Sequence, residues 1–155
     1  MKPNTGFTLL ELMIVISILA FLAAVSTPNI ISWFEGRKLS SASRDVLSAM
    51  QTARLRAVKE RANAVVRFDL VNNTFEAFVD DGGLTPADAG DNARNASEML
   101  IKSGSYTSVN IFGGPAFVAF TSRGFANAAG TVTLQDGNGN QKQITVSITG
   151  NSQIL

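Results

Sequence analysis

Cysteine and histidine are both absent from the 155 residues of this chain. Without cysteine the chain can form no disulfide and offers no thiolate to a metal. Without histidine it lacks the side chain that most often acts as a general base at neutral pH, which is also the commonest zinc ligand. These two absences argue against a zinc site and lower the expectation of an enzyme.

Net charge is small as well, because 13 lysine and arginine residues face 12 aspartate and glutamate residues. Basic residues outnumber acidic ones between residues 37 and 61, whereas acidic residues outnumber basic ones from residue 62 onward. The second part is mildly acidic, which argues against a strongly basic nucleic-acid-binding domain. The chain is long enough for one domain with a modest core.

A long apolar run occupies residues 7–25 and contains one carboxylate, Glu11. As a helix, with a rise of about 1.5 Å per residue, this run spans roughly 28 Å, close to the thickness of a bilayer core. A carboxylate in a membrane helix costs about 2.5–3.5 kcal/mol at the helix centre and less near its end. Such a residue usually has a function and a partner, so Glu11 needs an explanation.

Two simple interpretations explain part of this segment. A secretory signal peptide would use Lys2 as its positive region and residues 24–26 as the small residues for cleavage. The run is longer than the apolar core of such peptides, about 7–15 residues, and it contains a charge that those cores avoid. A plain single-span anchor explains the length of the run, but it explains neither Glu11 nor the short leader.

A third interpretation accounts for every feature of the segment. If the chain is cut between Gly6 and Phe7, the new amino group lies about one helical turn from Glu11. The carboxylate can then pair with this amine or with the amine of a neighbouring copy. Charge is neutralised when subunits pack together, which makes Glu11 an assembly residue.

The stretch GFTLLELMIVISILAFLAAVSTP resembles the N-terminal signal of type IV pilins and type II secretion pseudopilins. The family pattern is a short basic leader that ends in glycine, then a phenylalanine and, after a short interval, a glutamate. A long apolar helix with a proline further along completes it. The matching positions are Lys2, Gly6, Phe7, Glu11 and Pro28. Residue types and spacings agree together, so the resemblance is specific.

This resemblance implies cleavage after Gly6 by a prepilin peptidase, N-methylation of Phe7 and use of Glu11 in filament assembly. The chain lacks the paired cysteines that are common in the C-terminal regions of type IV pilins, which argues against a disulfide-looped major pilin. Three later stretches are similar to the GspH/FimT-like branch: ARLRAVKERANAVVRFD (53–69), FEAFVDDGG (75–83) and ITVSITGNSQI (144–154).

The helix is expected to continue beyond the apolar run and to end near Arg61. Pro28 lacks an N–H and should kink or loosen the helix. Beyond it, apolar residues recur at spacings of three and four and form one stripe, which we expect to pack on the following domain. The stripe consists of Leu39, Ala42, Val46, Ala49, Met50, Ala53 and Ala57.

From residue 63 the apolar period changes to two, which is typical of antiparallel strands with one buried face. Two alternating stretches separated by the turn VNN predict a hairpin. Residues 80–95 are rich in Asp, Gly and Asn and predict a long exposed loop. The predicted strands cover residues 63–70, 75–79, 100–101, 108–112, 115–122, 131–136 and 141–148.

Two further kinds of site have weak support. Asp136, Asn138 and Asn140 alternate like the opening of a calcium loop, but the later residues of such a loop are missing, and a turn explains them better. The aspartates of residues 80–91 could collect a cation, although loop solubility explains them too. DNA binding would need basic residues at one place. The available ones, Arg94, Lys102, Arg123 and Lys142, are scattered and outnumbered by acidic residues.

The sequence therefore predicts an α+β fold in which a long N-terminal helix packs on an antiparallel sheet. It predicts no catalytic residue, no cofactor and no metal site. The expected parts are a cleaved leader over residues 1–6, a helix over 7–61 and a β domain over 62–155. The helix is expected to be transmembrane over about residues 7–25.

The predicted function is that of a structural minor subunit of a type II secretion pseudopilus or a type IV pilus. A DNA-binding minor pilin for transformation is the alternative. The expected partners are other pilins or pseudopilins, a prepilin peptidase and inner-membrane lipid, and not nucleic acid. We expect a single-pass protein of the bacterial inner membrane with its globular domain outside the cytoplasm before it enters a filament. Lys2 is opposed by three basic residues after the run, so this orientation depends on the leader motif.

Overall fold

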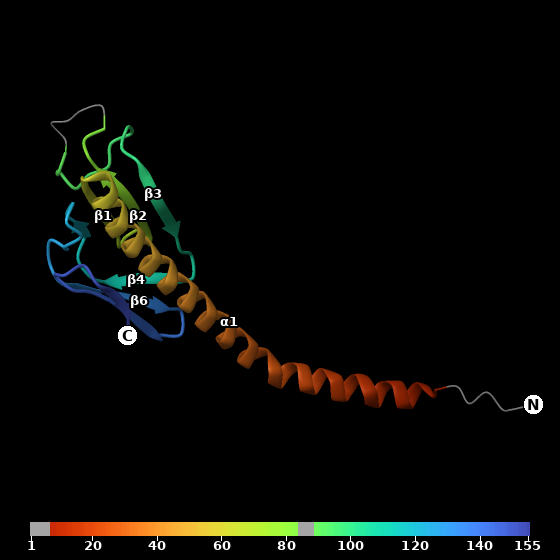
Figure 1. Cartoon of the computed structure of the whole chain (residues 1–155). Coiled ribbons are helices and arrows are strands. Elements are labelled where there is room, and N and C mark those ends of the chain that lie inside the picture. Colours follow the sequence, from red (N-terminus) through yellow and green to blue (C-terminus); the bar gives the residue numbers. More distant parts are fainter. Residues whose placement is uncertain (1–6, 84–88) are drawn as a thin grey trace, which may run out of the picture. The chain divides into compact units, whose positions relative to one another are not determined.

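The computed structural model describes residues 7–83 and 89–155, apart from the side chains of residues 27–29. The chain divides into two compact units, Met1–Phe34 and Glu35–Leu155. The helix α1, Leu9–Glu60, begins in the first unit and ends in the second. Within the second unit, Figure 1 shows that α1 lies across the strands of two sheets.

The helix α1 ends at Glu60 because the next residue leaves the right-handed helical conformation. Arg61 has a φ of 55°, the left-handed conformation that commonly follows a helix C-terminus. The predicted end near Arg61 agrees with this boundary. The backbone is helical at residue 28, but the side chain of Pro28 lies outside the described residues, so the kink stays a prediction.

The second part of α1 buries the apolar stripe that its period of three and four predicted. Every residue of the stripe, from Leu39 to Ala57, is at most 3% exposed. Four of the stripe residues are alanines, and such small side chains leave room for a sheet to approach the helix closely. Leu55, which is off the stripe, is 70% exposed. The stripe is therefore the face of α1 that holds the globular unit together.

The first sheet has the strand order β3-β2-β1-β5, and all of its pairs are antiparallel. Its central strands form the predicted hairpin, in which Val66 lies opposite Ala77 and Phe68 lies opposite Phe75. These four side chains are buried in the core. The strands are β1 (Asn63–Asp69), β2 (Thr74–Asp80), β3 (Leu100–Ser105) and β5 (Phe117–Phe120).

The second sheet has the strand order β4-β6-β7-β8, again antiparallel. The sequence predicted one sheet and one last strand over residues 141–148, so both details are corrected here. Strand β7 ends at Val146 and a further strand follows, because Gly150, with a φ of 80°, donates its N–H to the Ser147 carbonyl and makes a turn. The strands are β4 (Val109–Gly113), β6 (Gly130–Asp136), β7 (Gln141–Val146) and β8 (Ser152–Ile154).

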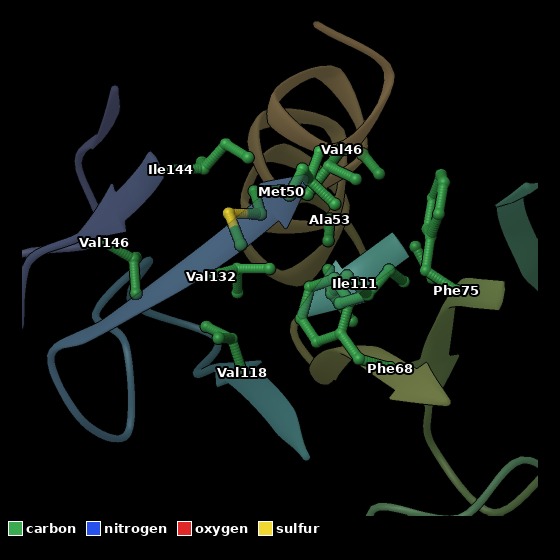
Figure 2. Packing of buried hydrophobic residues seen from close by; sticks show 14 of the residues in the cluster. Val46, Met50, Ala53, Phe68, Phe75, Ile111, Val118, Val132, Ile144 and Val146 are labelled. Carbon is green, nitrogen blue, oxygen red and sulfur yellow. The ribbon is translucent and has the colours of Figure 1, made fainter. Parts of the chain in front are cut away.

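One hydrophobic core joins both sheets to the second part of α1. Figure 2 shows Val46 and Met50 of the helix close to Val132 of β6 and Ile111 of β4. Phe68 of β1 belongs to the same cluster. Residues 35–155 therefore form a single globular unit, in which the helix covers the inner faces of two sheets.

Candidate assembly site

The N-terminus of α1 is capped by Thr8. The N–H of Glu11 donates to the Thr8 hydroxyl over 3.2 Å, and the N–H of Leu12 donates to the Thr8 carbonyl over 3.1 Å. Thr8 is thus the N-cap and Glu11 occupies the third helical position, as in the capping-box pattern Thr-x-x-Glu. Sequence reasoning missed the role of Thr8, although this spacing was the signal that could have revealed it.

The N-terminal part of α1 is apolar and exposed within its own unit. It makes α1 the one helix of the described residues that is long and apolar enough to cross a membrane. Phe7, just before the helix, is 86% exposed, and the large apolar side chains that follow it up to Val25 are exposed as well. Exposed apolar surface of this extent marks a segment that meets lipid or other apolar helices.

Glu11 differs from the serines of this segment in how its polar atoms are satisfied. The hydroxyls of Ser17 and Ser26 donate to the carbonyls of Met13 and Leu22, over 2.7 and 2.8 Å. These bonds keep both hydroxyls paired within the helix. Among the residues that the structure describes, no group pairs with the Glu11 carboxylate. The charge is therefore available to a partner from outside the chain.

Only part of the predicted cleavage site lies within the described residues. Gly6 and Lys2 lie outside the described residues, and Phe7 is exposed directly before the cap residue Thr8. Cleavage and methylation therefore stay predictions. The positive end of the helix dipole lies at this N-terminus, where a carboxylate such as that of Glu11 is favourable by about 0.3–1 kcal/mol at exposed positions.

The loop after β2 is held by two buried carboxylates. Asp80 accepts hydrogen bonds from the N–H groups of Gly90 and Asn92, over 2.7 and 3.1 Å. Glu98 accepts from the N–H groups of Gly82 and Asn95, over 3.0 and 2.9 Å. The sequence predicted an exposed, soluble loop here. The structure corrects this for Asp80, which is buried and satisfies backbone donors of the loop, as does Glu98 just beyond the predicted range.

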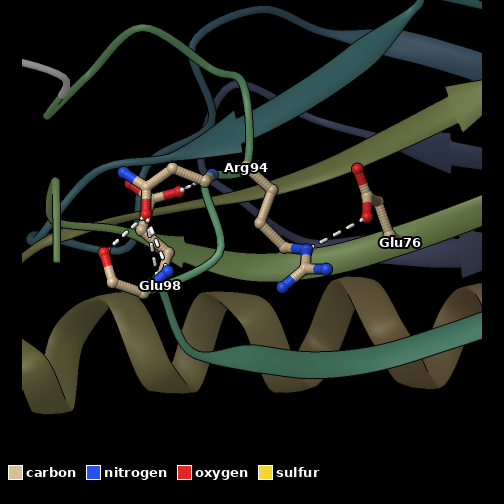
Figure 3. A network of polar contacts seen from close by, with 5 residues as sticks. Glu76, Arg94 and Glu98 are labelled. Atoms are coloured by element: carbon tan, nitrogen blue, oxygen red, sulfur yellow. Dashed lines mark hydrogen bonds and ion pairs between the residues drawn. The ribbon is translucent and has the colours of Figure 1, made fainter.

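The same loop is also attached to the outer side of the first sheet. Figure 3 shows Arg94 reaching across to Glu76 of β2, where the two side chains form an ion pair over 3.3 Å. Exposed pairs of this kind contribute about 0–1 kcal/mol. This pair therefore positions the loop more than it stabilises the fold.

Asp136 organises the turn between β6 and β7. Its carboxylate accepts from the N–H groups of Asn138 and Asn140 and from the Asn140 side chain, over 3.0, 2.8 and 2.8 Å. Burial raises the pKa of Asp136, but these hydrogen bonds outweigh burial and lower the pKa below its usual value. Both carboxylate oxygens of Asp136, one of the residues considered for calcium, are used by the turn. The described residues contain no group of three metal-ligating side chains.

The basic residues considered for DNA binding are partly engaged within the globular unit. Arg94 pairs with Glu76, and Lys102 pairs with Asp45 of α1 over 3.0 Å. A phosphate-binding surface needs cations that are free to replace counterions. No observation of the described residues favours the alternative of a DNA-binding minor pilin.

Two family models match the chain, one over its N-terminal segment and one over most of its globular unit. Residues 42–151 match the family described as type II transport protein GspH, and residues 1–27 match the prokaryotic N-terminal methylation motif. Over 50 residues the chain is 48% identical to the type IV major pilin protein PilA of Myxococcus xanthus. This match covers 32% of the chain and 22% of the length of PilA.

Solved structures with a similar fold include two minor subunits. The type IV minor pilin FimU of Pseudomonas aeruginosa is 14% identical, with a TM-score of 0.55 over 79% of this chain and 92% of FimU. The minor pseudopilin EpsH from the type 2 secretion system of Vibrio cholerae is 13% identical, with a TM-score of 0.56 over 76% of this chain and 96% of EpsH. At these identities the likeness shows a shared fold.

Proposed function

Since the chain belongs to the GspH family of type II transport proteins, we propose that it is cut after Gly6, methylated on Phe7 and assembled through α1. The family and the fold are those of pilin-type structural subunits, minor pilins or pseudopilins, and not of enzymes. Such subunits assemble with other pilins in a filament.

The proposed processing is supported by the N-terminal methylation motif over residues 1–27. Cleavage between Gly6 and Phe7 removes the leader and creates an amine directly before the Thr8 cap. In the uncut chain Phe7 contributes an amide nitrogen, which carries no charge. The cut therefore adds a cation at the end of the helix where Glu11 holds an anion.

One observation carries the proposed assembly role: the Glu11 carboxylate is unpaired among the described residues of an otherwise apolar, exposed helical segment. A neighbouring subunit packed alongside can supply the Phe7 amine as its partner. In a bundle of apolar helices, removal of one partner from such a pair typically costs about 3–5 kcal/mol. The pair therefore favours packing in one register over others.

The membrane position follows from the apolar run. Residues 9–26 give a helix of roughly 27 Å, enough to cross the bilayer core once. Trp33 and Phe34 lie further along α1, beyond residues 27–32, and are exposed and in edge-to-face contact, with ring centroids 5.2 Å apart. Tryptophan is enriched at membrane interfaces. We place the leader on the cytoplasmic side of the inner membrane and the globular unit outside the cytoplasm before assembly.

The proposed filament is a type II secretion pseudopilus or a type IV pilus, since the same N-terminal signal serves both. The GspH match favours secretion, whereas the 50-residue match to PilA comes from a pilus protein. In either filament, α1 would have the same structural role.

Two measurements test this proposal. Intact-mass analysis of membrane-extracted protein should give a chain that begins at Phe7 and carries one added methyl group. A mature chain that begins near residue 27 would instead establish the signal-peptide interpretation. The single tryptophan, Trp33, should be quenched most strongly by lipids brominated near the headgroup. Quenching that is strongest at the bilayer centre, or none at all, would contradict the proposed membrane position.

A further inference from the structure

The strand β8 forms an open edge of the second sheet. It pairs with β7 alone among the described residues. The N–H of Leu155 donates to the Gln143 carbonyl over 2.8 Å, and the Asn151 carbonyl accepts from the N–H of Ser147 over 2.9 Å. Residues 151 and 155 therefore direct their backbone groups toward β7.

Antiparallel strands alternate the direction of their backbone groups from one residue to the next. Since residues 151 and 155 bond to β7, the N–H and C=O groups of Ser152 and Ile154 point away from it. No described residue bonds these outward groups. Ser152 is only 8% exposed, so the half-buried Ile154 offers the more accessible groups of this edge to one further strand.

Two of the other edge strands, β4 and β5, each have a backbone amide bonded to an asparagine side chain. Asn73 accepts from the N–H of Ile111 on β4 over 3.0 Å. Asn127 accepts from the N–H of Ala119 on β5 over 3.0 Å, and its own N–H donates to the Ala119 carbonyl. Such covers protect edges from unwanted pairing. The outer edges of β8 and β3 have no such cover among the described residues.

A groove of about 550 Å³ lies between α1 and the start of β8. On the helix side, Leu55 and Val58 are 70% and 49% exposed. These apolar side chains are off the buried stripe and have no place in the core of the globular unit. The groove is lined by Gln51, Arg54, Leu55, Val58, Lys59, Gly150, Asn151 and Ser152.

The polar groups of the groove indicate the chemistry of its occupant. Lys59 and Arg54 are the charged residues of its lining, and the lining contains no carboxylate. The Nε of Arg54 donates to the Gly124 carbonyl over 3.0 Å, which fixes this side chain at the groove. The Ser152 hydroxyl is buried and has no hydrogen-bond partner among the described residues. Lys59 lies 3.8 Å from the Glu60 carboxylate, a long and exposed pair, so the lining keeps a net positive charge that an acidic side chain of the occupant matches.

We propose that this groove and the β8 edge receive an extended, acid-bearing segment of a neighbouring pilin-type subunit. The segment adds to β8 as a further strand, with backbone bonds to Ile154. One of its apolar side chains packs on Leu55 and Val58, and its carboxylate lies near Lys59. The inference rests on the proposed assembly into a filament and gives that assembly a second contact, separate from α1 packing at Glu11.

The absence of cysteine makes this contact accessible to site-specific crosslinking, since an introduced cysteine is the only thiol of the chain. In the experiment, the full-length Leu55→Cys variant is labelled on its cysteine with a benzophenone maleimide, a photocrosslinker. The labelled chain is studied in cells that contain all subunits of its own filament. The matched control is Val71→Cys, at an apolar residue of the β1–β2 turn that is 88% exposed. The same photocrosslinker on Ile14→Cys of α1 measures contact between the N-terminal helices of neighbouring subunits, and therefore filament assembly.

The edge contact is tested by a second pair of variants. Ile154→Pro removes the outward N–H but leaves the bonds to β7, and proline is tolerated at such edge positions. Ile154→Ala removes most of the same side chain and keeps the N–H. We expect Ile154→Pro to lower the Leu55→Cys crosslink about tenfold, because a backbone bond is lost and the added strand meets the ring. Ile154→Ala should change it about twofold or less. Thermal unfolding of both variants confirms that the globular unit is folded.

The expected result is a crosslink from Leu55→Cys to a pilin-type subunit, mapped to an acid-bearing segment outside that subunit's N-terminal helix. A crosslink from Ile14→Cys without one from Leu55→Cys overturns this inference and leaves the proposed function standing. Loss of both crosslinks overturns this inference and the proposed function together. Equal crosslinking of Val71→Cys, equal effects of the two Ile154 variants, or a Leu55 crosslink to lipid or nucleic acid also overturns the strand contact.

Discussion

The backbone N–H of Glu11 donates to the hydroxyl of Thr8 over 3.2 Å, which makes Thr8 the N-cap of a 52-residue helix. Glu11 therefore has two separable properties. Its amide belongs to the helix cap, whereas its carboxylate has no partner among the described residues. A substitution at Thr8 changes the first property and leaves the second in place.

We expect Thr8→Val to weaken the cap without removing the charge needed for assembly. Loss of an N-cap hydroxyl costs about 1 kcal/mol, so the Glu11 amide should exchange with solvent roughly fivefold faster. Amide hydrogen exchange of the full chain in micelles measures this. Thr8→Ser keeps a hydroxyl and should exchange like the original chain. Unchanged exchange in Thr8→Val would show that the observed bond contributes nothing to the helix end.

Asp136→Ala should destabilise the globular unit through the β6–β7 turn. The substitution leaves the amide groups of Asn138 and Asn140 without their acceptor, at a cost of about 1–3 kcal/mol. Denaturant unfolding of the full chain in micelles measures the loss. Asp91→Ala is the matched control, because Asp91 accepts one bond, from the N–H of Ala93, at an exposed position. Equal losses in the two variants would contradict the role of Asp136.

The pH dependence of this turn has a definite sign. The pKa of Asp136 is lowered in the folded chain, since hydrogen bonds to the ionised form outweigh burial. The stability that its ionised form contributes is therefore present above its ordinary pKa of 3.8 and is lost as pH falls through the lower folded value. The stability difference between the original chain and Asp136→Asn should shrink over that acidic range. A difference that does not change with pH would contradict the lowered pKa.

Tyr106 supplies the second pH test, because it is the only tyrosine of the chain. Its hydroxyl donates to the Ala42 carbonyl of α1 over 3.3 Å. Burial, followed by the nearby Asp45 carboxylate, raises the pKa of Tyr106 above its ordinary value of 10.0. The stability that the neutral phenol supports is fully present below pH 10 and is lost as pH rises through the folded pKa.

Absorbance titration of the native chain should therefore show tyrosinate well above pH 10, whereas the chain unfolded in urea should ionise near pH 10. Asp45→Asn should lower the native value only slightly, because burial is the larger cause. A native titration that coincides with that of the unfolded chain would contradict the burial of Tyr106 against α1.

The helix and most strands could be predicted from the sequence because their signals are local. The buried stripe of α1 follows from spacings of three and four, and the β1–β2 hairpin follows from alternation around a short turn. Strand pairing depends on contacts between distant segments. The division into two sheets was therefore missed, since alternation identifies a strand and not its neighbours.

Polar residues with local backbone partners were harder to interpret. Asp80 and Glu98 sit in a polar stretch that resembles a solvated loop, yet both are buried and accept backbone N–H bonds. No period in the sequence marks such bonds. The Thr8 cap could have been recognised, because Thr-x-x-Glu before an apolar run is a local signal.

In the proposed assembly, the Glu11 carboxylate pairs with the amine of a neighbouring Phe7. Glu11→Val should make insertion easier, by up to about 3 kcal/mol, because a charge is removed from an apolar helix. It should also leave the neighbour's amine unpaired, at about 3–5 kcal/mol in a helix bundle. The globular unit, residues 35–155, does not include Glu11 and should unfold as in the original chain.

The most direct measurement is crosslinking of the N-terminal helices through Ile14→Cys, with and without Glu11→Val, together with cleavage and membrane level. Glu11→Gln removes the charge and keeps the size, and Glu11→Asp keeps a carboxylate. We predict normal cleavage and membrane level in all variants, loss of helix crosslinks in Glu11→Val and Glu11→Gln, and partial retention in Glu11→Asp. Normal crosslinking in Glu11→Val would contradict the assembly role of this carboxylate.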